Sequence, residues 1–275
     1  MTDARDALEP PAAPASGRDV LRQVAVISAV VFMIVAAMVG VGLFGGTSVR
    51  DLQGGALDAD ATYLAPARPA FGIWSLIYVL MVGYAVWQAL PGQRARERQR
   101  AVGWWVALTA VLNGGWLLAA QFLNLGATVL AIVILLAALG WTLERLHTYP
   151  GVHTLDLVLL DAGVGLHLGW VALATVANVT AWLTVSAPPS WGDAPEPWGI
   201  AVLIVVGLVG LALTVFTAGR LAPGLAMGWG LVWIGFGRTD DPISIPIAVT
   251  AWIVAGVVVF APFLVKLFTL RAGSD

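Results

Sequence analysis

Residues 101–143 have the sequence AVGWWVALTAVLNGGWLLAAQFLNLGATVLAIVILLAALGWTL, which contains no charged side chain. A charge at the centre of a bilayer costs roughly 2.5–3.5 kcal/mol on insertion scales, so membrane spans appear as charge-free stretches. One helix needs about 20 residues to cross ~30 Å of hydrocarbon. The stretch is long enough for two helices, and Asn124, Leu125 and Gly126 supply a tight turn between them. It therefore predicts an α-helical membrane protein.

Further charge-free stretches lie on both sides of this one. Together they predict an all-α, polytopic membrane helix bundle with eight transmembrane helices. We expect these helices at about 23–44, 70–90, 103–123, 126–146, 163–186, 198–218, 221–237 and 245–268. The stretch 221–237 is short for a span but is apolar nearly throughout.

The composition of the whole chain supports the same class. Charged residues make up 11% and hydrophobic residues 59% of the 275 positions, against about 25% charged residues in an average soluble domain. The mean hydropathy is +0.88. So few charges cannot cover the surface of a soluble enzyme, and a net charge of −2 offers no basic surface for nucleic acid. Without cysteine, the chain has no disulfides, cysteine-bound iron–sulfur clusters or thiol catalysis.

The basic residues predict the topology. With the N-terminus inside, three basic residues fall in outer loops: Arg50, Arg68 and Arg238. Eleven fall on the cytoplasmic side: Arg5, Arg18, Arg22, Arg94, Arg96, Arg98, Arg100, Arg145, Arg220, Lys266 and Arg271. Because positive charges favour the cytoplasm, we expect both termini there. The bias towards arginine, alanine, glycine and valine is typical of a GC-rich bacterial genome, so we expect the bacterial cytoplasmic membrane.

Two asparagines inside the predicted spans need hydrogen-bond partners. Asn113 and Asn178 each lie eight residues after the tryptophan of a Trp-Val-Ala-Leu sequence. A buried amide must be satisfied by hydrogen bonds, and lipid offers none. Each asparagine therefore either links helices through a hydrogen bond or faces a shared cavity. Trp74 and Tyr78 lie one helical turn apart in the second span and offer an aromatic face.

Three segments resemble the tryptophan-rich sensory protein family, TspO/MBR, also called the translocator proteins. They are FGIWSLIYVLM in the second span, LNGGW in the third and WVALATVANVTAW in the fifth. The matching positions are Phe71, Trp74, Tyr78, Met81, Leu112, Asn113, Trp116, Trp170, Ala174, Thr175 and Asn178. The resemblance covers residues 25–187.

This resemblance implies a five-helix bundle whose pocket opens towards the loop between the first two helices. It also implies binding of porphyrins, haem-pathway intermediates and apolar drug-like ligands. The ligand-binding residues we expect are Trp74, Tyr78, Asn113, Trp116, Trp170, Ala174 and Asn178, with His167 as a further candidate. The chain departs from the family in two ways: its first loop has no tryptophan, and three spans follow the fifth.

The predicted organisation is a disordered cytoplasmic tail over 1–22, a TspO-like bundle over 23–187 and a three-helix extension over 188–275. Near the fifth span, Asp161 is expected at the membrane interface as a solvated or capping group. No catalytic or metal-binding set is found, so the sequence favours no enzyme activity.

We therefore expect a membrane protein that binds a hydrophobic aromatic ligand, such as a tetrapyrrole, for sensing or transport. No cofactor is required, although a porphyrin or haem-like ligand fits the expected pocket. The expected partners are the lipid bilayer and a hydrophobic small molecule, with no nucleic acid. The open alternatives are a secondary transporter of a small molecule, a membrane assembly or chaperone factor, and a homodimeric state.

Overall fold

The structure is a computed structural model that describes residues 14–272, and α-helices dominate this part of the chain. The helices are α1 (Gly17–Gly40), α2 (Ile73–Ala89), α3 (Glu97–Phe122), α4 (Leu125–Thr148), α5 (Gly163–Ser186), α6 (Pro195–Phe216), α7 (Leu221–Gly237) and α8 (Ile245–Ala272). Except for α7, these helices are long and apolar enough to cross a membrane. The prediction of a polytopic membrane helix bundle is confirmed. Both α2 and α7 have 17 residues and are roughly 25 Å long at about 1.5 Å per residue, but α2 is lengthened by the 3-10 helix Arg68–Gly72 that precedes it.

The first helix begins earlier than predicted. The disordered tail was expected to reach residue 22, but α1 begins at Gly17, and residues 1–13 lie outside the described part. The Ser16 backbone N–H donates to the Asp19 carboxylate (2.9 Å), which caps the helix. Arg100 from α3 pairs with the same carboxylate (2.7 Å). The charges at the start of α1 are therefore neutralised within the bundle, which lets the helix extend beyond the charge-free stretch.

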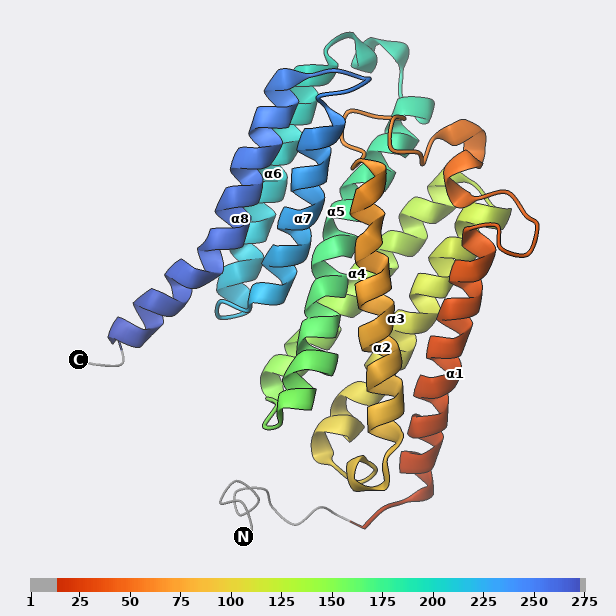
Figure 1. Cartoon of the computed structure of the whole chain (residues 1–275), viewed down its shortest axis with the longest axis vertical. Helices are drawn as coiled ribbons and strands as arrows, with labels where there is room; N and C mark the ends of the chain where they lie inside the picture. Colours follow the sequence, from red (N-terminus) through yellow and green to blue (C-terminus); the bar gives the residue numbers. More distant parts are fainter. Residues whose placement is uncertain (1–13, 273–275) are drawn as a thin grey trace.

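Figure 1 shows two groups of helices side by side. In the first group, α1 packs against α3, α3 against α4 and α4 against α5, with α2 in front. In the second, α8 packs against both α6 and α7. The loop between α1 and α2, residues 41–72, covers one end of the first group, and the α2–α3 connection lies at the other end.

The two groups meet where α5 packs against α7. Glycines allow this close approach. A Cβ atom at Gly169 would overlap the backbone of Pro223, and a Cβ atom at Gly230 would overlap Leu173. Trp170 and Ala226 belong to the same buried cluster although they lie on α5 and α7. The three-helix extension therefore shares a core with the five helices before it.

Asp161 differs from the solvated or capping group that the sequence predicted. It lies in a π-helical segment, Asp156–Ala162, that leads into α5. Its carboxylate pairs with Arg98 (2.5 Å) and with Arg220 (2.5 Å), and its side chain is only 11% exposed. Arg98 belongs to α3 and Arg220 precedes α7, so these ion pairs join three distant segments at the end of the bundle opposite the 41–72 loop.

Candidate functional site

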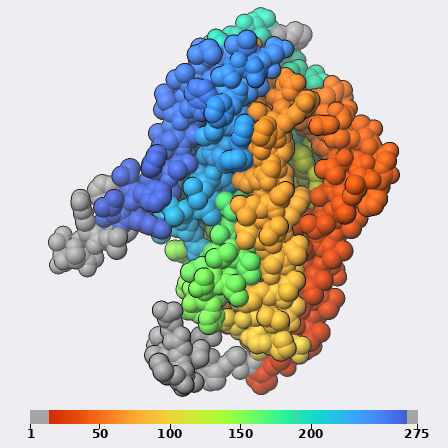
Figure 2. All heavy atoms as spheres, in the orientation of Figure 1, coloured from red at the N-terminus to blue at the C-terminus, as the bar shows by residue number. Residues whose placement is uncertain are grey.

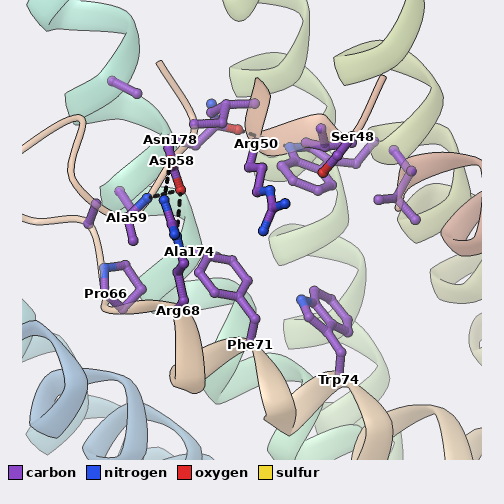
Figure 3. A pocket seen from close by; sticks show the side chains of 18 of the residues that line it. Ser48, Arg50, Asp58, Ala59, Pro66, Arg68, Phe71, Trp74, Ala174 and Asn178 are labelled. Carbon is purple, nitrogen blue, oxygen red and sulfur yellow. Dashed lines mark hydrogen bonds and ion pairs between the residues drawn. The ribbon is translucent and has the colours of Figure 1, made fainter. Parts of the chain in front are cut away.

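A cavity of about 570 Å³ lies at the end of the first helix group that the 41–72 loop covers. We call this loop the lid. Residues of α1, α2, α3 and α5 form the walls, and lid residues complete the enclosure. The predicted binding residues Trp74, Tyr78, Trp116, Trp170, Ala174 and Asn178 all line this one cavity. Figure 3 shows Phe71 and Trp74 on one side of it, with Ser48 and Arg50 from an earlier part of the lid opposite.

The aromatic wall is a cluster of four rings. Trp74 stacks on Tyr78, with ring centroids 5.3 Å apart and an angle of 29° between the ring planes. Trp170 meets Trp74 edge-on at 6.2 Å and Phe71 edge-on at 5.6 Å. Rings held in these offset and edge-on arrangements form a stable wall with apolar faces. Ala174 lines the cavity as well and leaves room beside them.

Asn178 combines the two roles that the sequence left open. Its side-chain oxygen accepts a hydrogen bond from the Trp116 indole N–H (2.9 Å), and its amide donates to Thr128 Oγ1 (2.9 Å). These bonds link α5 to α3 and α4. Because Asn178 also lines the cavity, it holds Trp116 in a fixed orientation beside any bound molecule.

Asn113 does not line the cavity, in contrast to our expectation. It is buried behind Tyr78, whose hydroxyl donates to the Asn113 oxygen (3.4 Å). The Asn113 amide lies 3.4 Å from His167 Nε2. His167 is also fully buried and contacts the Trp74 ring edge-on at 5.7 Å. Both polar residues support the aromatic wall from behind, and neither reaches the cavity.

Charged residues of the lid form the outer part of the cavity. Arg68 pairs with the Asp58 carboxylate (2.9 Å), which also accepts the Ala59 backbone N–H (2.8 Å). Partial burial raises the pKa of Asp58, but the hydrogen bonds from Arg68 and Ala59 outweigh it and lower the pKa below its ordinary value. Figure 3 shows Arg50 extending from the lid into the cavity towards Phe71 and Trp74.

The sequence did not identify the polar partners at this site. Arg50 and Arg68 were used only to predict topology, and Asp58 and Thr128 were not singled out. The two aspartate neighbours of Ala59 in the sequence are a weak sign of a charged lid, but nothing in the sequence links Thr128 to Asn178. Within the described residues, no group of three or more histidine, aspartate or glutamate side chains is arranged to hold a metal ion.

Comparison with protein families gives one match, to the family described as TSPO-like protein, over residues 22–264. The chain belongs to the TSPO-like protein family. The match reaches from α1 into α8 and is therefore longer than the stretch 25–187 on which the sequence motifs lie. No curated protein and no solved structure matches the chain. Membership of the TSPO-like family agrees with a multi-pass membrane protein with a cavity suited to ligand binding or transport.

Proposed function

We propose that this TSPO-like protein binds a flat, largely apolar aromatic molecule that carries an anionic group, of the porphyrin class. The observation that carries the proposal is the arrangement of Trp74, Tyr78, Trp116 and Trp170 around one cavity whose outer part contains Arg50. Aromatic rings supply apolar contact area, and a few polar groups fix orientation, as in most small-molecule sites. Arg50 suits a carboxylate, because guanidinium and carboxylate form charge-assisted hydrogen bonds.

The volume of the cavity supports a ligand of this size. Pockets that enclose small molecules measure about 300–1,000 Å³, and this cavity, at about 570 Å³, lies inside that range. The rings of the aromatic wall pack against one another, so a ligand meets preformed surfaces on the helix side. On the other side, the ligand meets residues of the lid.

The test is a titration of the purified full-length protein with protoporphyrin IX, followed by quenching of tryptophan fluorescence. We expect saturable binding that Trp116→Ala weakens by about tenfold or more, equivalent to ~1.4 kcal/mol. The matched control is Trp141→Ala, because Trp141 lies on α4 with its side chain 53% exposed and outside the cavity. Equal losses in both variants, or no saturable binding by the unaltered protein, would contradict the proposal.

Sensing and transport make different demands on the same cavity. A secondary transporter couples movement of its substrate to an ion gradient, usually through ionisable residues within the membrane. Asp161, the acidic residue at the start of α5, is paired with two arginines. This favours binding over proton-coupled transport. Uptake of porphyrin into proteoliposomes that depends on an imposed proton gradient would favour transport instead.

A further inference from the structure

The lid consists of local turns. Its internal backbone hydrogen bonds join residues three positions apart, such as Asp51 N–H to Ser48 O (2.9 Å) and Ala65 N–H to Thr62 O (3.2 Å). Turns of this kind shape a loop but do not determine where the loop lies on the rest of the protein. The position of the lid over the cavity therefore depends on its contacts with distant segments.

Most of those distant hydrogen bonds come from α7 and the residue that follows it. In the described chain, one bond joins the lid to the α3–α4 turn, from Gln53 to Leu123 O (2.8 Å). Two bonds involve α7 itself: Trp229 Nε1 donates to Ala70 O (2.8 Å), and Ala67 N–H donates to Trp233 O (3.1 Å). Arg238 supplies two more. The C-terminal helices thus hold the lid at several points.

Arg238 makes the central contact. Its guanidinium is buried, with the residue only 1% exposed. Nη1 donates to Thr62 O (3.0 Å) and Nη2 donates to Ala59 O (3.1 Å), while the guanidinium lies 6.0 Å from the centre of the Tyr63 ring. A planar fork of N–H donors can bind two carbonyl oxygens at once, which the single ammonium of lysine does less well.

The residues that Arg238 holds are also residues of the cavity. Ala59 and Thr62 line it, whereas Arg238 does not. Their carbonyls point to Arg238, so movement of this arginine is transmitted directly to the cavity wall. Figure 2 shows the lid and the start of α2, in orange, in contact with the blue C-terminal helices at one end of the molecule.

We propose that Arg238 is a positioning residue for the ligand site and that the α7–α8 segment clamps the lid, which sets the rate at which ligand enters and leaves. This gives α7 and the residue that follows it a role in the site without contact between Arg238 and the ligand. The rate effect rests on the proposed function, whereas the clamp itself is a property of the ligand-free protein.

The experiment compares Arg238→Gln with Arg220→Gln in the full-length protein. Arg220 is a matched control, because it lies at the other end of α7 and pairs with Asp161. Hydrogen–deuterium exchange of the ligand-free protein should be about tenfold faster over residues 56–66 in Arg238→Gln and unchanged there in Arg220→Gln. Protoporphyrin IX should both bind and dissociate several-fold faster in Arg238→Gln, with a smaller change in Kd, since an opened lid affects both rates.

Each possible outcome supports or overturns the clamp. Unchanged exchange over residues 56–66, or an equal increase throughout α1–α5, would overturn the clamp. Faster lid exchange in a protein that binds no porphyrin would support the clamp and contradict the proposed ligand. If Arg238→Gln does not fold, Arg238→Lys, which keeps the charge but loses the fork, should give an intermediate increase in lid exchange. No increase in that variant would count against the proposal.

Discussion

Asn178 has hydrogen-bond partners on two neighbouring helices and also lines the cavity. Thr128 is one of those partners but does not line the cavity. Substitutions at Asn178 and at Thr128 therefore distinguish two roles of the buried Asn178 amide. One role joins helices, which is worth on the order of 0.6–2 kcal/mol in a membrane. The other role is to hold the Trp116 indole in a fixed orientation beside the ligand.

We predict that Asn178→Leu weakens porphyrin binding by about tenfold, or ~1.4 kcal/mol, because the Trp116 indole loses its acceptor and its fixed orientation. Thr128→Val removes the link to α4 and leaves the cavity wall in place, so its effect on Kd should stay within about twofold. Fluorescence titration measures both. If the two variants bind equally weakly, the asparagine acts only in helix packing.

A second prediction for a single residue concerns Arg50, which extends from the lid towards Trp74. Arg50→Gln removes the positive charge but keeps a polar side chain. It should weaken the binding of protoporphyrin IX by about fivefold to tenfold and leave the binding of its dimethyl ester unchanged, since the ester has no carboxylate for the guanidinium. Equal effects on the acid and the ester would show that Arg50 does not recognise the anionic group.

At the level of elements, α5 and α7 approach each other closely. A Cβ atom at Gly169 would overlap the Pro223 backbone, so Gly169→Ala must push the helices apart and should lower stability by about 1–3 kcal/mol. On α8, a Cβ atom at Gly256 would meet no other atom within 4 Å. Gly256→Ala should therefore leave the thermal unfolding midpoint unchanged or raise it slightly. A midpoint for Gly169→Ala equal to that of the unaltered protein would argue against this contact.

The lid is the element with a predicted pH dependence. Asp58 has a lowered pKa, so its ion pair with Arg68 stabilises the lid above the ordinary value of 3.8 and is lost as the pH falls through the lowered value. The lid should stay ordered from neutral pH down to about pH 4 and loosen below it.

A fluorophore measures this loosening. Because the chain has no cysteine, Ala56→Cys provides a single labelling site in the lid. Fluorescence anisotropy of the label should fall below about pH 4. In the additional variant Asp58→Asn, the anisotropy should already be low at pH 7 and should not change on acidification. A pH response that persists without the Asp58 carboxylate would assign the transition to another group.

For the whole molecule, the lid and the α5–α6 connection lie at one end, and the α2–α3 connection lies at the other (Figure 1). Combined with the distribution of basic residues, this predicts that the cavity opens to the outside of the cytoplasmic membrane. Reporter fusions after Gln99 and Asp275 should be cytoplasmic, and a fusion after Gly192 should be periplasmic. A periplasmic C-terminus would mean that the short helix α7 does not span.

The sequence alone predicts the helices and six of the residues that line the cavity. Charge-free stretches predict spans because lipid excludes charge wherever the stretch lies in the fold. Of the residues expected to bind ligand, Asn113 and the further candidate His167 lie behind the wall and do not line the cavity. The expectation for these residues rests on the resemblance to the TspO/MBR family, and helical spacing adds that Trp74 and Tyr78 share a helix face.

The polar contacts between distant segments depend on how the helices pack in three dimensions. Arg238 and Ala59 are 179 positions apart in the sequence. Asp161 is 63 positions from Arg98 and 59 positions from Arg220. A charged residue near the end of a predicted span can face water, lipid headgroups or a buried partner. The residues beside it in the sequence do not show which of these three environments it has. The choice depends on which helix packs beside it. Here the close approach of α7 to α5 brings Arg238 to Ala59 and Thr62, two lid residues that line the cavity.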